Sequence, residues 1–539
     1  MAHTVRYTLP MVRQGRPSRG TVVLLLAALA AGAALRAFSV ARARLWLDEY
    51  IMLELASLPT PADVVRGIAA SNNTPVYPLL LHGLIRVAGD DPLAPRLISA
   101  CFGLLTLLLT ARAALRRWGW PAAAIASTLV GLSAIAAHFS SEIRPYAILS
   151  FLFLASLEAF DASLRSRRLG PLLLQGLLIV LAIGLHPYGA ALLAVGPLAS
   201  LAVDRSAFRR QLGISAVSLA VVAPYFLVQL PRLPPEANEY LVDLWRGHGP
   251  LAPLGVLLRD VAPSAHWPSA IGPPASLLRG MLELASFSLI VAVAVASVIA
   301  LRGRPDVRRD PYPAALTALL GVSALLALGG ALIGTPVAVP GRFACALVAP
   351  FALLVAWAST LNAAARLCAC GMAAVAVLAT AEALAHPGPR GIRPELLAAA
   401  ALRHSATRPA LVITVGLTGL PLRYQLRNLA GLTFQPFPLE LERHGTWWAP
   451  GHALRDPATL ASDAERLARA AREAARSGRQ VFIEGADYPV AASLREALGR
   501  SFRFRPISRY NRGLFELVPH PREVGRAAEA RAERAGEDY

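Results

Sequence analysis

The segment TVVLLLAALAAGAALRAFSVARARLWLDEY, residues 21–50, decides the fold class of this chain. Its apolar part, Thr21 to Val40, has the length of about 20 residues that a helix needs to cross the hydrocarbon core of a bilayer. Two adjacent carboxylates, Asp48 and Glu49, follow this run and are flanked by a tryptophan and a tyrosine, residues that anchor chains at headgroup depth. Such an acidic pair is either ordinary interfacial solvation or part of a functional site.

Composition places the whole chain in the membrane class. Over 539 residues, 55% are hydrophobic and 16% are charged, whereas soluble domains carry about 25% charged residues. The net charge of +19 comes from arginines that punctuate the apolar runs, which indicates membrane orientation rather than nucleic-acid binding. All 53 basic residues are arginine, which excludes a phosphate-loop lysine and Schiff-base chemistry at lysine. The four cysteines lie in apolar runs and are expected to be small buried hydrophobes.

Arginine-rich connections between the apolar runs predict the topology. The positive-inside rule assigns the N-terminus to the cytoplasm. It assigns to the same side the arginine pairs and clusters at 116–117, 165–168, 205–210 and 302–309. The stretch from Val76 to Val87 is too short to span and is expected to lie on the membrane. We expect a multi-pass protein of the cell (plasma or inner) membrane with about eleven spans, at 21–40, 94–115, 121–140, 146–163, 171–185, 188–203, 212–230, 280–301, 314–334, 343–361 and 367–385.

The composition changes after Ala385, where Pro387-Gly388-Pro389 marks a linker. Because the number of spans is odd, everything beyond it is expected outside the cytoplasm. Strand patterns at 411–415, 481–483, 502–504 and 514–517 alternate with helix patterns at 462–477 and 491–498, which predicts a small α/β domain. The expected domains are 1–386 in the membrane, with an external loop 41–93 that carries the Asp-Glu pair, 387–525 as the extracytoplasmic α/β domain, and 526–539 as a disordered tail.

Four polar clusters fall at the outer ends of predicted spans. They are Asp48-Glu49 after the first span, Ser140 to Tyr146 after the third, His186-Pro187-Tyr188 after the fifth, and Pro340 to Phe343 after the ninth. Taken singly, each has a plain structural interpretation: Glu142 with Arg144 as an ion pair, His186 as a packing histidine, and Arg342 as a snorkelling side chain. Together they indicate a substrate path, because ionisable groups at membrane depth usually face a cavity.

Arginines and carboxylates beside lipid suit one kind of chemistry. The planar fork of arginine binds phosphate, and a carboxylate near it can act as a general base toward a hydroxyl group. The set therefore predicts transfer from a lipid phosphate to an acceptor on the outer face.

At these residues the chain resembles the GT-C membrane glycosyltransferases, and within them family 39, which includes protein O-mannosyltransferases and the aminoarabinose transferase. The similar pieces, in chain order from Trp46 to Ala358, are the Asp-Glu pair, the loop-helix motif of residues 74–82, Arg96 to Ala100, Ser141 to Tyr146 as Glu-x-Arg-x-Tyr, and His186-Pro187-Tyr188. Two positions depart from the family: Asn73-Thr74-Pro75 stands for His-Pro-Pro, and Ser141 for Gln. They border the acceptor and donor pockets, so the sugar and the acceptor stay open.

The resemblance implies a role for each matching residue. Asp48 would deprotonate the acceptor, and Glu49 would orient the acceptor or support Asp48. The acceptor would attack the anomeric carbon of a polyprenyl-phosphate sugar with inversion. Arg144 and Arg342 would bind the phosphate, and Glu142 would hold Arg144. Tyr77, His82, Tyr146, His186 and Tyr188 would line the cavity. The family leaves room for a divalent cation, for which the sequence shows no dedicated ligand set, so we expect no metal site.

Two functions of other classes also fit a polytopic chain with charges at the membrane. A lipid flippase or transporter would explain the spans, although transporters usually show repeated halves and midplane sites, and no repeat stands out here. A scaffold or assembly subunit with a degenerate site is the third alternative. The partners expected for the enzyme are a polyprenyl-phosphate-linked sugar, a protein, lipid or glycan acceptor, and membrane lipid, with no nucleic acid.

Overall fold

The structure is a computed structural model. It describes residues 17–69, 73–166, 168–229, 231, 248–249, 251–263, 277–302, 310–332, 342, 344–385, 394–416, 419–439, 456–507 and 513–521. The chain divides into two compact units. The membrane unit comprises residues 1–44, 73–232 and 238–388, and the C-terminal unit comprises residues 45–72, 233–237 and 389–539.

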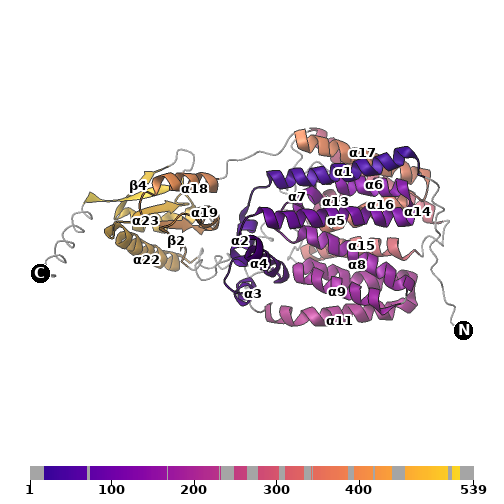
Figure 1. Ribbon diagram of the computed structural model, residues 1–539, viewed down its shortest axis with the longest axis horizontal. Coiled ribbons are helices and arrows are strands. Elements are labelled where there is room, and N and C mark those ends of the chain that lie inside the picture. The colour runs from indigo at the N-terminus through magenta and orange to yellow at the C-terminus, as the bar shows by residue number, and fades with distance from the viewer. Residues whose placement is uncertain are drawn as a thin grey trace. The chain divides into compact units, whose positions relative to one another are not determined.

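The membrane unit is a helical bundle (Figure 1). Among the described residues, seven helices are long and apolar enough to cross a membrane: α1 (Arg19–Arg42), α5 (Leu93–Trp118), α8 (Tyr146–Ser166), α11 (Arg205–Gln229), α14 (Leu277–Arg302), α15 (Pro311–Leu332) and α17 (Ala363–Ala385). Shorter apolar helices are α4 (Val76–Ala88), α6 (Trp120–Gly131), α9 (Leu169–Leu185), α16 (Ala344–Ala358), and η1 (Pro187–Ala190) with α10 (Ala191–Val203). The predicted polytopic helical fold is confirmed, whereas the number of about eleven spans is not.

The predicted span 121–140 is broken, since α6 ends at Gly131 and α7 (Ala134–Phe139) follows. Ser133 caps α7 by accepting a hydrogen bond from the Ala136 N–H at 3.2 Å. The carbonyls of Val130 and Gly131, left without helical partners at the end of α6, accept from the buried guanidinium of Arg36 on α1 at 3.3 and 3.2 Å. The two helices approach closely here, because a Cβ at Gly131 would lie 2.9 Å from the Ala28 carbonyl oxygen.

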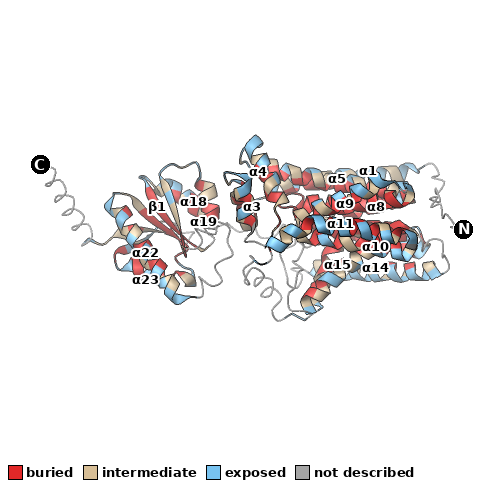
Figure 2. Ribbon diagram, turned by 90° about the horizontal axis from the view of Figure 1, so that it is seen from below, coloured by how far each residue is buried: buried red, intermediate tan, exposed pale blue. Residues whose placement is uncertain are grey.

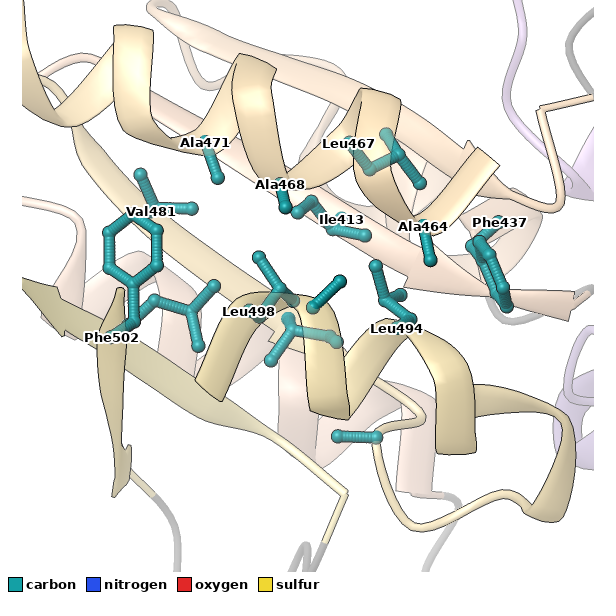
Figure 3. Packing of buried hydrophobic residues seen from close by; sticks show 14 of the residues in the cluster. Ile413, Phe437, Ala464, Leu467, Ala468, Ala471, Val481, Leu494, Leu498 and Phe502 are labelled. Carbon is teal, nitrogen blue, oxygen red and sulfur yellow. The ribbon is translucent and has the colours of Figure 1, made fainter. Parts of the chain in front are cut away.

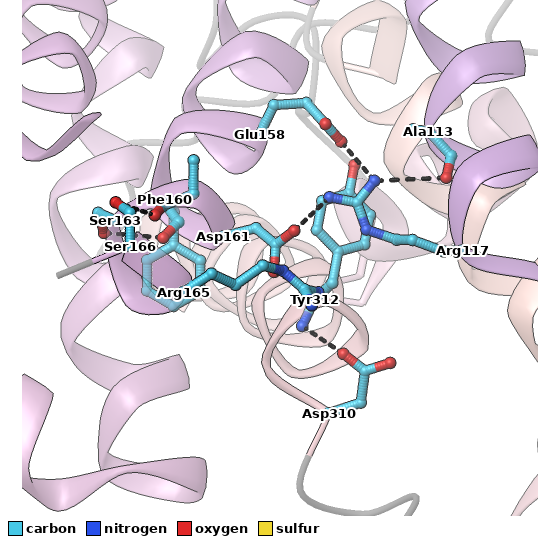
Figure 4. A network of polar contacts seen from close by, with 11 residues as sticks. Ala113, Arg117, Glu158, Phe160, Asp161, Ser163, Arg165, Ser166, Asp310 and Tyr312 are labelled. Atoms are coloured by element: carbon cyan, nitrogen blue, oxygen red, sulfur yellow. Dashed lines mark hydrogen bonds and ion pairs between the residues drawn. The ribbon is translucent and has the colours of Figure 1, made fainter. Parts of the chain in front are cut away.

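Helix α8 is the most completely buried of the long helices (Figure 2). It packs against α5, α9 and α16. Near its end lies a polar network with Arg117 at its centre (Figure 4). The guanidinium of Arg117 contacts Glu158 at 2.8 Å and also Asp161, and it lies 3.6 Å from the ring centre of Tyr312 on α15. Arg165 contacts Asp161 at 2.8 Å. Ion pairs thus join α5 to α8, and the contact of Arg117 with the Tyr312 ring joins α15 to the same network.

The C-terminal unit contains a mixed five-stranded sheet in the order β2-β1-β3-β5-β4. Strands β2 (Leu432–Phe437), β1 (Ala410–Val415) and β3 (Gln480–Glu484) are parallel, while β5 (Phe515–Pro519) is antiparallel to β3 and to β4 (Phe502–Pro506). Its helices are α18 (Pro394–Ser405), α19 (Gly419–Leu426), α22 (Pro457–Arg476), η6 (Pro489–Ala491) and α23 (Ala492–Gly499). The predicted small C-terminal α/β region is therefore present.

Both faces of this sheet are covered, because neighbouring strand residues point to opposite sides. Leu411, Ile413 and Val415 of β1 pack with α22 and α23 on one face (Figure 3). Ala410 and Val412 pack with α18 and α19 on the other. Helix α22 begins five residues before the predicted helix 462–477: Asp456 accepts from the Ala458 and Thr459 N–H groups, and proline occupies the first turn.

Two further expectations concern the burial of the cysteines and the C-terminal tail. All four cysteines are unpaired, but only Cys345 is buried, and the expectation that all would be buried is wrong, since Cys101 and Cys370 are exposed on helices α5 and α17. The predicted disordered tail, 526–539, lies outside the described residues.

Candidate functional site

Arg144 lies directly before α8, in a turn that buries it almost completely. It is 5% exposed. Its Nη2 donates a hydrogen bond to the hydroxyl of Tyr146 at 3.3 Å, and its guanidinium carbon lies 5.6 Å from the centre of that ring. Tyr146, the first residue of α8, in turn packs edge-on against Phe139 of α7 with ring centres 4.8 Å apart. The turn therefore presents a guanidinium held by an aromatic ring at the end of the most buried helix.

His186 brings a second element to the same place. It lies in the turn between α9 and η1, outside both helices, with its ring centre 5.7 Å from that of Tyr146. Its Nδ1 accepts from the Tyr188 N–H at 3.2 Å, which places the proton of the neutral ring on Nε2. Burial, and then the positive charges of Arg144 and Arg342, lower the pKa of His186 to about 3. Two arginines and a neutral histidine thus gather around one point of the membrane unit.

Glu142 has a partner that the sequence analysis did not name. Its Oε1 contacts Nε2 of His138, one turn earlier, at 2.8 Å. That Glu142 holds Arg144 stays a prediction. The backbone carbonyl of Glu142 accepts from the hydroxyl of Ser99 on α5 at 2.7 Å, which ties the turn to the Arg96–Ala100 segment. Sequence reasoning missed His138. The four-residue spacing between a histidine and a glutamate was the signal that could have found it.

The other predicted cavity residues divide into two groups. Tyr77 and His82 are both buried on α4, a helix that packs against α9 and α5. Tyr188 stacks on Phe153 of α8, with ring centres 5.6 Å apart and an interplanar angle of 25°, which is the packing of a helix-contact residue. The structure thus brings Arg144, Tyr146, His186 and Arg342 together most clearly.

Asp48 and Glu49 belong to the C-terminal unit, on α2 (Leu47–Ala56), which α3 (Pro61–Ala69) follows. Glu49 is 1% exposed, and its Oε2 accepts from the Trp46 N–H at 3.1 Å, so it caps the first turn of α2. Asp48 is half-buried. That Glu49 assists Asp48, and that Asp48 acts on the same substrate as Arg144, stay predictions.

For metals, the described part of the chain contains no group of three or more His, Cys, Asp or Glu side chains placed to hold an ion. The side chains gathered around Tyr146 supply guanidinium, imidazole and phenol groups. Guanidinium groups and a neutral imidazole N–H are hydrogen-bond donors, and the set matches an anionic oxygen-rich group such as a phosphate.

Comparisons with known proteins gave structural neighbours alone; no family model and no curated protein matches the chain. The crystal structure of ArnT from Cupriavidus metallidurans bound to undecaprenyl phosphate shares 18% identity, with a TM-score of 0.48 over 93% of this chain and 98% of that one. The oligosaccharyltransferase of Archaeoglobus fulgidus in the apo form shares 13% identity, with a TM-score of 0.47 over 93% of this chain and 74% of that one. Both are of the GT-C kind that the sequence resembles.

Proposed function

We propose that this chain is a membrane glycosyltransferase that moves a sugar from a polyprenyl-phosphate donor to an acceptor on the extracytoplasmic face. The observation that carries the proposal is the cluster at the start of α8, where Tyr146 contacts both the Arg144 guanidinium and the His186 ring, and where the charge of Arg342 also acts on His186. Two guanidinium groups beside a histidine that stays neutral favour an anion, and apolar helices favour a lipid.

The donor phosphate is assigned to Arg144 and Arg342. Arginine can bind two phosphate oxygens at once, and its charge stabilises the phosphate as the sugar leaves it. Tyr146 holds the Arg144 guanidinium through its hydroxyl group. His186, with Nδ1 occupied by a backbone N–H, can offer only Nε2–H to the substrate. Glu142 stays part of the proposed donor site through its backbone link to α5, while its carboxylate orients His138.

Asp48 is assigned as the general base. An acceptor hydroxyl or amine loses its proton to the Asp48 carboxylate and attacks the anomeric carbon from the face opposite the phosphate. The bond between that carbon and the phosphate oxygen breaks, and polyprenyl phosphate leaves with both bonding electrons. The new glycosidic bond has the inverted configuration. This assignment rests on the sequence pattern around Asp48 and on its support by the capping residue Glu49.

The donor site is tested by binding of undecaprenyl phosphate to purified protein. Arg144→Lys should bind it more weakly, because an ammonium group cannot reproduce the planar fork, and Arg144→Ala more weakly still. Arg86→Gln, which removes an exposed arginine from α4, is the matched control and should bind as the parent does. Parental affinity in Arg144→Ala would remove the phosphate role of that residue.

The base is tested by the release of polyprenyl phosphate from labelled lipid-linked sugars, with a cell-envelope extract as the source of acceptor. Asp48→Asn keeps the size of the side chain but cannot take up the proton, so the rate should fall by about 10²–10⁴-fold while undecaprenyl phosphate still binds. Glu49→Gln should be impaired less. A parent that translocates lipid and never breaks the sugar–phosphate bond would favour the transporter alternative instead.

A further inference from the structure

The helix that carries the Asp-Glu pair, α2, packs within the C-terminal unit. Residues 45–72 cluster with residues 389–539, and the contact is made by α19, the helix that follows β1. No motif of the sequence assigns a task to the C-terminal unit, so this contact is the first feature that connects it to the proposed chemistry.

Three interactions of different kinds form the contact. The Gln425 side-chain amide donates a hydrogen bond to the hydroxyl of Tyr50 at 3.0 Å. The rings of Tyr50 and Tyr424 meet edge to face, with centres 5.5 Å apart and an interplanar angle of 62°. An ion pair of 3.6 Å joins Arg423 and Glu54. Tyr50 is 3% exposed, so its ring is enclosed at this contact.

These interactions fix the rotation of α2 about its own axis. Tyr50 and Glu54 lie one turn apart and therefore on one face of the helix. Asp48, two residues before Tyr50, lies about 200° around the helix from it, on the face away from α19. Holding Tyr50 and Glu54 thus sets the direction of the Asp48 side chain without touching it, while Glu49 secures the first turn.

Helix α19 is itself a rigid support. Leu422 and Leu426 are almost fully buried in the hydrophobic cluster that covers one face of the sheet, with Ala410, Val412 and Phe482. Arg423, Tyr424 and Gln425 lie between these two anchors. The orientation of α2 is therefore determined by the packed core of the C-terminal unit.

We propose that the C-terminal unit takes part in the reaction by orienting the base: Tyr424, Gln425 and Arg423 of α19 are positioning residues for Asp48, acting through Tyr50 and Glu54. The proposal rests on the proposed function, since it assigns the C-terminal unit a role in the same step. The contact between α2 and α19 can be tested without measuring activity. Its consequence is tested through the rate of sugar transfer.

The contact is tested by cross-linking Glu54→Cys to Arg423→Cys with a short bifunctional thiol reagent, in full-length protein whose four native cysteines are replaced by alanine. Cross-linking should be efficient for this pair and absent from Glu54→Cys combined with Arg500→Cys on the far side of the sheet. Failure of the first pair to cross-link would overturn the proposal, whatever the activity of the protein.

The consequence is tested by combining Tyr424→Leu with Gln425→Met, which removes the ring contact and the hydrogen bond together. The release of polyprenyl phosphate should fall by about 10-fold or more, since misplacement by about 1 Å can cost 10²-fold. The effect should appear in kcat, with unchanged affinity for undecaprenyl phosphate. Leu494→Ala opens a cavity against the other face of the sheet and is the control for general destabilisation. An equal loss of kcat in this control, at equal folded fraction, would contradict a positioning role.

Charge reversal adds a rescue experiment. Glu54→Arg and Arg423→Glu should each lower kcat by about 5-fold, because like charges replace a weak exposed ion pair, and the double reversal should recover most of the rate. Rescue is expected only if the two helices touch during turnover, so its absence would count against the proposal.

A cycle with Asp48→Asn separates this inference from the proposed function. If α19 acts through Asp48, the Tyr424→Leu/Gln425→Met change should cause no further loss in the Asp48→Asn background. A full further loss there would overturn the positioning role and leave the base assignment intact. Parental activity in Asp48→Asn alone would overturn the base assignment, and with it the role of α19 in orienting it, while the cross-link would still report the contact.

Discussion

Arg117 offers a test of how the membrane unit is held together. Its side chain is 3% exposed and makes ion pairs with both Glu158 and Asp161, whose side chains are 15% and 7% exposed. Arg117→Met keeps the length of the side chain and leaves Glu158 without its cation, while Asp161 keeps the half-exposed Arg165. Removing one partner from a buried ion pair typically costs about 3–5 kcal/mol, so we expect a loss of that size in the free energy of unfolding.

The measurement is thermal unfolding in detergent, followed by tryptophan fluorescence, with two matched arginine variants. Arg165→Met removes the more exposed member of the same network and should cost less. Arg500→Gln breaks only exposed pairs, with Glu465 and Glu496, and should leave the melting temperature close to that of the parent. The expected order of melting temperatures is Arg117→Met lowest, then Arg165→Met, then Arg500→Gln. Equal melting temperatures for Arg117→Met and Arg500→Gln would refute the reasoning.

The same variant should spare the donor site. Glu158 and Asp161 lie 12 to 15 residues along α8 from Tyr146, which is about 18–22 Å at the rise of an α-helix. The folded fraction of Arg117→Met should therefore bind undecaprenyl phosphate with parental affinity. Weakened binding in protein shown to be folded would mean that the two ends of α8 are coupled.

The remaining predictions concern the cap of α2, the buried imidazole and the topology. Glu49→Gln should keep the cap and most of the activity, whereas Glu49→Ala should lose about 1 kcal/mol of helix stability and more activity, measured as kcat and melting temperature. Because the pKa of His186 is lowered to about 3, the unfolded chain binds a proton at a higher pH than the folded chain does. The free energy of unfolding should therefore fall as the pH drops from about 6.5 toward 3. In melting temperatures measured over this pH range, His186→Gln should show a weaker dependence on pH. Reporter fusions after Leu169 and after Pro387 should report opposite sides of the membrane, and two cytoplasmic signals would contradict the topology.

The helices of the bundle could be predicted because each apolar run carries its own signal. Length, composition and arginine-rich ends require no knowledge of the partner helices. The break after Gly131 could not be predicted in this way, because it depends on Arg36, a residue of another helix that satisfies the exposed carbonyls. The contact between Glu142 and His138 is of another kind, because the four-residue spacing in the sequence could have revealed it.

In the C-terminal unit, strands with apolar runs were predicted and β2 was missed. The segment contains Pro436, which argues against a strand because proline cannot donate to a sheet. The sheet order explains the exception, since β2 is an edge strand and one side of it needs no partner. Helices α2 and α19 were missed as well. Their apolar residues are explained by burial against distant parts of the chain, which local periodicity does not reveal.

That Arg144 and His186 lie near one another was predictable, since both come at the ends of apolar runs on the same predicted face of the membrane. Which side chains touch was not, because contacts such as Arg144 with Tyr146 depend on the shape of one turn. The dependence of Asp48 on the C-terminal unit was invisible in the sequence.

The contact between Tyr50 and Gln425 joins residues 375 positions apart, and this separation has a consequence for biosynthesis. At translation rates of about 5–20 residues per second, α2 leaves the ribosome on the order of tens of seconds before α19 exists. During this interval the ring of Tyr50 lacks its contacts with Tyr424 and Gln425, and the nascent chain must keep an exposed apolar segment from pairing elsewhere. Asp48 and Glu49, together with Glu54, give the α2 segment a negative charge, which favours its solubility until α19 is made.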